Sequence, residues 1–144
     1  MLRLSKRMEQ IIVRVYGRKE KEVELAKKLG ISKQAVSKTL KEARSKLTEI
    51  FIRLSEILNS DIIKINVEKG YAILRNRQTG KKIYIFYVPG YGPQTLFEDK
   101  IECNNTNKSI CTRIMEAALQ WGIINNIDRD LNKMIEKIIS EIEK

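Results

Sequence analysis

The side chains that offer a defined chemistry in this sequence lie between residues 33 and 41. Lys33, Gln34, Ser37, Lys38 and Lys41 follow one another in steps of one and three. On a helix, residues three or four positions apart share a face, so these amines, amide and hydroxyl would gather on one side. Such a face donates hydrogen bonds to anionic and carbonyl oxygens. It therefore favours recognition of a polar or anionic surface.

No motif typical of an enzyme accompanies this face. The sequence contains no histidine, no phosphate-binding glycine motif, no G-x-S-x-G and no carboxylate pair in a recognisable motif. Recombinases with serine or tyrosine nucleophiles normally need a larger catalytic domain, and 144 residues leave little room for one. We therefore expect neither enzymatic activity nor a cofactor or metal ion.

Two short helices joined by a tight bend are expected to position the polar face. Residues 24–40 read ELAKKLGISKQAVSKTL, in which Gly30 follows the last apolar residue of a helix over residues 20–29. A glycine there can adopt the left-handed backbone that ends a helix. Ser32 is a good N-cap for the next helix, and Ala26 lies where the two helices must approach closely. The inward residues would be Leu25, Leu29, Ile31, Val36 and Leu40.

The segment LAKKLGISKQAVSKTL closely resembles the helix-turn-helix of phage repressors and of bacterial and archaeal transcription regulators. Its alanine, glycine and inward aliphatic residues stand at the expected separations. An earlier apolar stripe from Met8 to Tyr16, ending at Gly17, predicts a preceding helix. The unit over residues 5–47 is thus similar to sigma-factor region 4 and to archaeal Tfx-type regulators. Val23 departs from the pattern, because related sequences more often carry a polar residue there.

The resemblance implies a role for each polar residue. In such modules the second helix lies in the major groove of double-stranded DNA, with its N-terminal residues at the base edges. Gln34 can pair with adenine, lysine can donate to guanine or phosphate, and Ser37 suits either a donor or an acceptor. The alternatives are the solvated side of an amphipathic helix, or a module that contacts protein or RNA. We predict base contacts from Lys33, Gln34, Ser37 and Lys38, and phosphate contacts from Ser32, Lys41 and Arg44.

The distribution of charge agrees with an anionic partner. The net charge is +10, and residues 1–60 hold 15 Lys or Arg against 7 Asp or Glu, whereas residues 101–144 hold 6 against 7. A concentrated basic excess favours a polyanion, because each phosphate that is neutralised releases condensed counterions. The alternative is a solubilising lysine-rich surface of the kind common in heat-adapted proteins.

The helical pattern continues beyond Leu40 without a glycine or proline as far as residue 59. Its apolar residues alternate steps of three and four, as in a coiled coil. Either this helix pairs with that of a second copy, or it packs on the protein's own sheet. We favour a homodimer, because two half-sites would match a palindromic DNA site. The predicted dimer seam consists of Leu47, Ile50, Leu54 and Ile57.

After residue 60 the hydrophobic period changes from helical to alternating. Three runs, DIIKINVE, YAILRNRQ and KKIYIFYV, are separated by glycine turns and predict a three-stranded antiparallel meander. The third run is apolar on both faces, so we expect both faces to be covered. PGYGP at residues 89–93 is expected to form a structural turn that ends the sheet or breaks it sharply. Helices over residues 109–127 and from a cap at Asp128 would follow.

A basic hairpin tip and a cysteine pair complete the candidate sites. A basic hairpin beside a helix-turn-helix is similar to the DNA-contacting wing of winged proteins, although a long helix intervenes here. We keep Arg75, Arg77, Lys81 and Lys82 as a possible secondary DNA contact, with a solvated hairpin as the favoured alternative. Cys103 and Cys111 are expected to be small buried or half-buried residues, with a disulfide as the alternative.

The sequence thus predicts an α+β protein with three segments: a helix-turn-helix domain at residues 1–47, a helical extension or dimerisation linker at 48–60, and an α+β domain at 61–144. The start, MLRLSKRMEQ, lacks the apolar block of a secretory signal, and no apolar run approaches the ~20 residues of a membrane span. We therefore expect a cytoplasmic protein that has no membrane partner.

The function that these features predict is sequence-specific DNA binding by a homodimeric transcription regulator. The alternative of another class is a binding module such as a plasmid or viral maintenance factor or an antitoxin, and a small DNA-processing enzyme is a third hypothesis. No motif in the sequence identifies a small-molecule effector.

Overall fold

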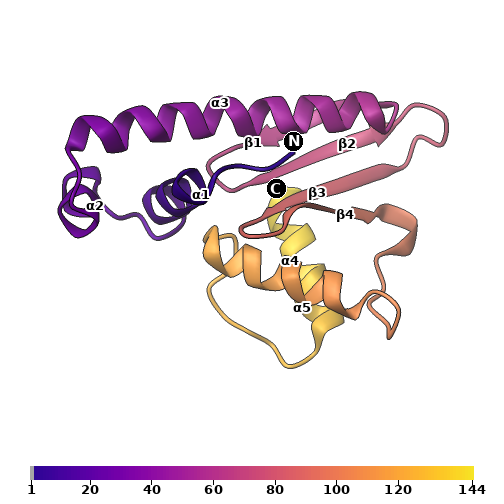
Figure 1. The fold of residues 1–144 in the computed structure, drawn as a ribbon. Coiled ribbons are helices and arrows are strands. Elements are labelled where there is room, and N and C mark those ends of the chain that lie inside the picture. The colour runs from indigo at the N-terminus through magenta and orange to yellow at the C-terminus, as the bar shows by residue number, and fades with distance from the viewer. Residues whose placement is uncertain (1) are drawn as a thin grey trace.

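The computed structural model describes residues 2–144 as an antiparallel sheet between two layers of helices (Figure 1). One layer holds α1 (Lys6–Ile12), α2 (Glu22–Leu29) and α3 (Lys33–Ile57), and a π-helical turn, Val13–Gly17, follows α1. The sheet consists of β1 (Ser60–Asn66), β2 (Tyr71–Asn76), β3 (Lys82–Val88) and β4 (Gly92–Phe97). The other layer holds α4 (Lys108–Gln120) and α5 (Leu131–Ile142), after a 3-10 turn at Glu98–Lys100. The α+β prediction is confirmed.

The sheet has one strand more than predicted. Its order is β1-β2-β3-β4, and β4 pairs with β3 from Gly92 opposite Val88 to Phe97 opposite Ile83. Gly90 and Gly92 both have positive φ, so the PGYGP segment reverses the chain in a tight turn and does not end the sheet. Pro93 is tolerated because β4 is an edge strand, where a backbone N–H can be spared.

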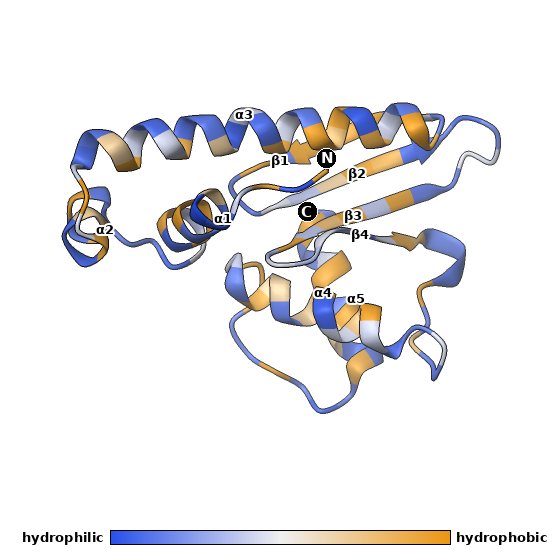
Figure 2. Cartoon of the chain, viewed as in Figure 1, coloured by the Kyte–Doolittle hydropathy of each residue, from blue (hydrophilic) through white to orange (hydrophobic). Residues whose placement is uncertain are grey.

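Strand β3 is buried on both faces, as its sequence predicts. Ile83, Ile85 and Tyr87 belong to the core under the N-terminal helices, whereas Tyr84 and Phe86 belong to the core under α4 and α5. Val88 lies in the first of these cores and not with Tyr84 and Phe86. Figure 2 shows the hydrophobic faces of α3 and of the C-terminal helices turned toward the sheet from opposite sides.

The apolar stripe of α3 packs inside this chain. Leu47, Ile50 and Leu54 are buried in the core that α3 shares with the sheet, while Ile57 is 69% exposed. The structure therefore places three of the four residues of the predicted dimer seam against the protein's own sheet, which is the alternative that the sequence left open. An amphipathic helix on a sheet and a coiled-coil helix use the same steps of three and four, so spacing alone does not distinguish them.

One hydrophobic core joins the N-terminal helices to the rest of the chain. It contains Leu25 of α2, Val36 of α3, Ile85 of β3 and Trp121 after α4. Helix α3 also runs without a break from Lys33 to Ile57, as its uninterrupted pattern predicts. The helix-turn-helix is thus held on the sheet by continuous packing.

A buried polar network fixes α1 on the sheet. The hydroxyl of Tyr87 donates to Glu9 at 2.6 Å and accepts from the amide of Leu4 at 2.7 Å. The amide of Gly90 donates to the same carboxylate at 3.1 Å. Burial, followed by the bond to Glu9, raises the pKa of Tyr87, so the hydroxyl keeps its proton.

The C-terminal helices are shorter than predicted. Gly122, with φ of 72°, ends α4 soon after Gln120, and a loop replaces the expected last two turns. The N-cap of α5 is Asp130, whose carboxylate accepts from the amides of Asn132 and Lys133, and not Asp128. Cys103 and Cys111 form a disulfide that joins the preceding loop to α4. Within the described chain, no helix combines the length and apolar character that crossing a membrane requires.

Candidate nucleic-acid interface

The bend between α2 and α3 has the predicted caps. Gly30 is left-handed, with φ of 66°, and the amide of Ile31 donates to the carbonyl of Ala26 at 3.1 Å. The hydroxyl of Ser32 accepts from the amide of Ala35 at 3.0 Å, which satisfies a free donor in the first turn of α3. The bend is therefore specified by local chemistry at both helix ends.

Packing inside the bend orients α3. Leu25, Ala26, Val36 and Leu40 are buried, so the opposite side of α3 faces solvent. We call this side the recognition face; it consists of Lys33, Gln34, Ser37, Lys38 and Lys41, all of which are exposed. The first turns of α3 extend beyond the end of the sheet, so neither the sheet nor the C-terminal helices cover them (Figure 1).

Most of the recognition face has no partner within residues 2–144. Lys33, Gln34, Lys38 and Lys41 make no side-chain hydrogen bond or ion pair in the described chain. Three amines and an amide are thus free to donate to an external acceptor. The structure brings these four predicted residues together on one open surface.

Ser37 is the member of the recognition face that has a partner. Its hydroxyl donates to Oε1 of Glu22, the first residue of α2, at 2.6 Å. Glu22 was not among the predicted site residues, because it lies fifteen positions away on another helix. No local sequence signal reports that contact.

Two predicted phosphate-contacting residues are engaged elsewhere. The hydroxyl of Ser32 serves as the cap of α3. The guanidinium of Arg44 donates to the hydroxyl of Tyr16 and to Glu68 at 3.2 Å, and it lies 5.3 Å from the centre of the Tyr16 ring. Arg44 thus ties α3 to the π-helical turn after α1 and to the turn after β1.

Further cations surround the N-terminal end of α2. Arg18, Lys19 and Lys21 are exposed in the segment between the π-helical turn and α2, directly before Glu22. Glu20 in the same segment accepts from Arg14 at 2.8 Å and from Lys28 at 3.4 Å. The hydrogen bond from Arg14 lowers the pKa of Glu20 below its usual range. In the sequence, only the positive charge of this segment indicates that it could contribute to an interface with an anionic partner.

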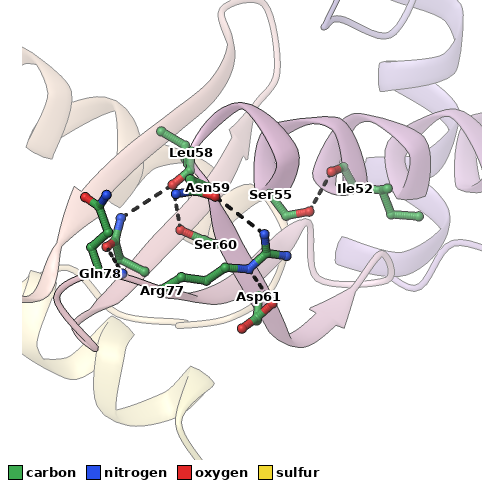
Figure 3. A network of polar contacts seen from close by, with 9 residues as sticks. Ile52, Ser55, Leu58, Asn59, Ser60, Asp61, Arg77 and Gln78 are labelled. Atoms are coloured by element: carbon green, nitrogen blue, oxygen red, sulfur yellow. Dashed lines mark hydrogen bonds and ion pairs between the residues drawn. The ribbon is translucent and has the colours of Figure 1, made fainter.

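The hairpin tip lies away from the recognition face. The amide of Arg77 donates to the carbonyl of Asn59, just past the end of α3, and its guanidinium pairs with Asp61 at 2.9 Å (Figure 3). Because α3 has 25 residues, its two ends are about 37 Å apart. The other three hairpin cations also have partners inside the chain: Arg75 with the carbonyl of Gly80, Lys81 with Asp99 and Lys82 with Glu143.

Comparison with known protein families agrees with this geometry. Residues 16–49 match the model of a helix-turn-helix DNA-binding domain. The match covers α2, the bend and the first part of α3, which are the elements that carry the recognition face. No curated protein and no solved structure matches the chain. Fold and match agree that residues 16–49 are similar to a helix-turn-helix DNA-binding domain, as the sequence resemblance predicts.

Proposed function

We propose that this protein is a transcription regulator that binds specific sites in double-stranded DNA as a homodimer. It acts by binding and not by catalysis, and it works in the cytoplasm. The observation that carries the proposal is the recognition face, whose free amide and amines lie on the exposed N-terminal turns of α3. Sequence is read where such groups meet base edges in the major groove.

The shape of the N-terminal layer supports entry into the groove. The major groove is about 12 Å wide and admits one α-helix. The first turns of α3 extend past the sheet, so DNA can approach them without meeting α4 or α5 (Figure 1). The remaining length of α3 lies on the sheet and would stay outside the groove. Only its N-terminal residues, Lys33 to Lys41, would touch bases or phosphates.

The homodimer needs a surface other than the predicted seam, because Leu47, Ile50 and Leu54 are buried. Ile62 and Ile63 of edge strand β1 are 41% and 46% exposed, and Ile52 of α3, the helix that precedes β1, is 40% exposed. Ile63 is the extra residue of a β-bulge and has no partner on β2. A second copy of the chain that covers these isoleucines with its own would bury apolar surface on both subunits.

Selection of DNA from a random library by the purified protein tests the DNA-binding proposal. We expect a site with dyad symmetry and an affinity that falls steeply with salt concentration. Gln34→Ala should weaken binding at the selected site by about 1–3 kcal/mol and at random DNA much less. Gln78→Ala, at the distant hairpin, is the matched control and should leave both affinities unchanged. Equal losses at the two DNAs would remove the assigned role of Gln34.

Analytical ultracentrifugation tests the dimer. Ile63→Lys should convert a wild-type dimer into a monomer, because it places a charge on the surface that we propose to be buried. Ile57→Lys introduces the same charge at an exposed isoleucine beside Leu2 and should leave the dimer intact. A wild-type monomer at concentrations that saturate the selected DNA would reject the homodimer.

A further inference from the structure

The contact between Ser37 and Glu22 determines what the recognition face can read. The hydroxyl oxygen of Ser37 lies 2.6 Å from Oε1 of Glu22. In this bond the serine hydroxyl is the donor and the carboxylate oxygen is the acceptor, since a carboxylate has no proton to give. The proton of Ser37 therefore points to Glu22, and the lone pairs of the serine oxygen remain for an external group.

This contact removes an ambiguity that a free serine would have. A serine hydroxyl rotates freely, so it can donate to an acceptor or accept from a donor, and on its own it suits any base. With its proton engaged, Ser37 presents acceptor sites alone.

Glu22 adds acceptor sites of its own. It is half-buried at the start of α2, and it forms no ion pair with a lysine or arginine of the described chain. Its other carboxylate oxygen has no hydrogen-bond partner among residues 2–144. The pair therefore forms a small region of acceptors inside a face that otherwise consists of donors.

We propose that Ser37 and Glu22 together read an exocyclic amino group of a base, the N4 of cytosine or the N6 of adenine. This inference rests on the proposed function and specifies one part of it. In the major groove guanine presents O6 and N7 and thymine presents O4, all of which are acceptors. An acceptor pair on the protein gives these bases no hydrogen bond and places lone pairs against lone pairs. Each half-site therefore contains one position that admits cytosine or adenine and rejects guanine and thymine.

In this account Glu22 is a specificity-determining residue that acts largely through Ser37. Its negative charge also weakens attraction to phosphates in general, so it lowers affinity for random DNA. Specificity is the difference between the affinities for two DNA sequences. A group that repels the wrong base increases this difference, as does a group that binds the right base.

The test compares base preferences selected by the wild type and by Glu22→Gln. The amide of glutamine can donate to the oxygen of Ser37, which frees the serine proton for O6 of guanine or O4 of thymine. We expect the restricted position to lose its preference, by about 5- to 150-fold in the affinity ratio between the allowed and rejected bases. Ser37→Ala should relax the same position and no other.

Glu24→Gln is the matched control. Glu24 lies on the same helix, is exposed and has no hydrogen-bond or ion-pair partner among the described residues. The change removes the same charge, so both variants should bind random DNA more tightly, but only Glu22→Gln should alter base preference. Affinity ratios between two DNAs do not depend on the fraction of folded protein, so partial unfolding would not imitate the result.

The outcomes separate this inference from the function on which it rests. If the wild type selects a sequence and Glu22→Gln selects the same bases at every position, the acceptor role is wrong and the regulator proposal stands. A wild-type selection whose half-site requires guanine or thymine where Ser37→Ala relaxes it also overturns the inference. A wild type that selects no sequence at all overturns both.

Discussion

Gly17 lies so close to the carbonyl oxygen of Gln120 that a methyl group at Gly17 would stand 2.0 Å from it. The same methyl group would lie 3.1 Å from the carbonyl carbon of Gln120 and 3.2 Å from the Cα of Trp121. All three are backbone atoms, which cannot turn aside as a flexible side chain can. Gly17 ends the π-helical turn before α2, and Gln120 ends α4, so this contact joins the N-terminal helices to the opposite layer.

Gly17→Ala should therefore destabilise the whole protein and not only its N-terminal helices. Overpacking against a fixed backbone costs about 1–3 kcal/mol, and we expect the upper end of that range. Gly80→Ala is the control, because nothing lies within 4 Å of its added methyl group. Gly80 has φ of +72°, so this change costs only the roughly 1–2 kcal/mol that a side chain meets in the left-handed region. Urea unfolding measures both, and equal losses would mean that α4 moves away from Gly17 at little cost.

The ion pair between Arg14 and Glu20 makes the free energy of unfolding depend on pH in the acidic range. Arg14 donates to both oxygens of Glu20, at 2.8 and 3.2 Å, and this holds the pKa of Glu20 below its usual range. Because the folded pKa is the lower one, the stabilisation is complete above the unfolded pKa of about 4.3 and is lost as pH falls through the folded value.

Glu20→Gln should lower the free energy of unfolding by about 1 kcal/mol at pH 7. The difference from wild type should shrink in acid, where the wild-type carboxylate is also neutral. Urea unfolding at pH 7 and near pH 3 measures this change. Glu24→Gln removes an unpaired carboxylate and should change stability little at either pH. A constant difference across that range would show that Glu20 acts through packing and not through charge.

Ser32 has a structural role and a predicted role at phosphate, and two substitutions separate them. Ser32→Ala removes the cap of α3 and should cost about 1 kcal/mol of stability. Ser32→Asp keeps a capping oxygen, so stability should be retained, but its charge would repel a phosphate and weaken DNA binding. Thermal unfolding and binding titrations measure the two effects. If Ser32→Asp binds DNA with unchanged affinity, no phosphate of the DNA lies close to Ser32 and its predicted phosphate contact is wrong.

The disulfide between Cys103 and Cys111 should stabilise the C-terminal layer without affecting DNA recognition. It closes a short loop, with a sequence separation of 8, for which loop-closure entropy gives about 2–3 kcal/mol. Reduction should lower the melting temperature, while affinity at the selected DNA should stay constant below the transition, because Cys111 lies in the core with α5, whereas the buried apolar residues of α3 lie in the other core. The double variant Cys103→Ala, Cys111→Ala should melt like the reduced protein and be insensitive to reductant.

A loss of DNA affinity on reduction, at a temperature where the protein stays folded, would contradict this separation. It would show that the C-terminal layer communicates with the recognition face through Gly17 and Gln120 or through Tyr87 and Glu9.

Local signals made much of this protein predictable. The bend depends on Gly30 and Ser32, whose conformational and hydrogen-bonding properties act within a few residues. Likewise, the burial of Val36 and Leu40 follows from their spacing and sets the outward direction of Gln34. The unbroken apolar run of β3 likewise predicts that both of its faces are buried. These features need no knowledge of distant residues.

Contacts between distant residues decided the rest. The stripe of Leu47, Ile50 and Leu54 is equally suited to a partner helix and to a sheet, and only the position of β2 and β3 selects between them. The fourth strand depends on how the chain reverses at Gly90, and the contacts of Glu22 with Ser37 and of Gly17 with Gln120 join residues that are far apart in sequence. The sequence by itself thus determined a helix-turn-helix with a polar outer face. Only tertiary packing decided that the apolar side of α3 lies on the sheet and that the hydroxyl of Ser37 points to Glu22. The reason is that periodicity shows which side of a helix is apolar but not which element covers that side.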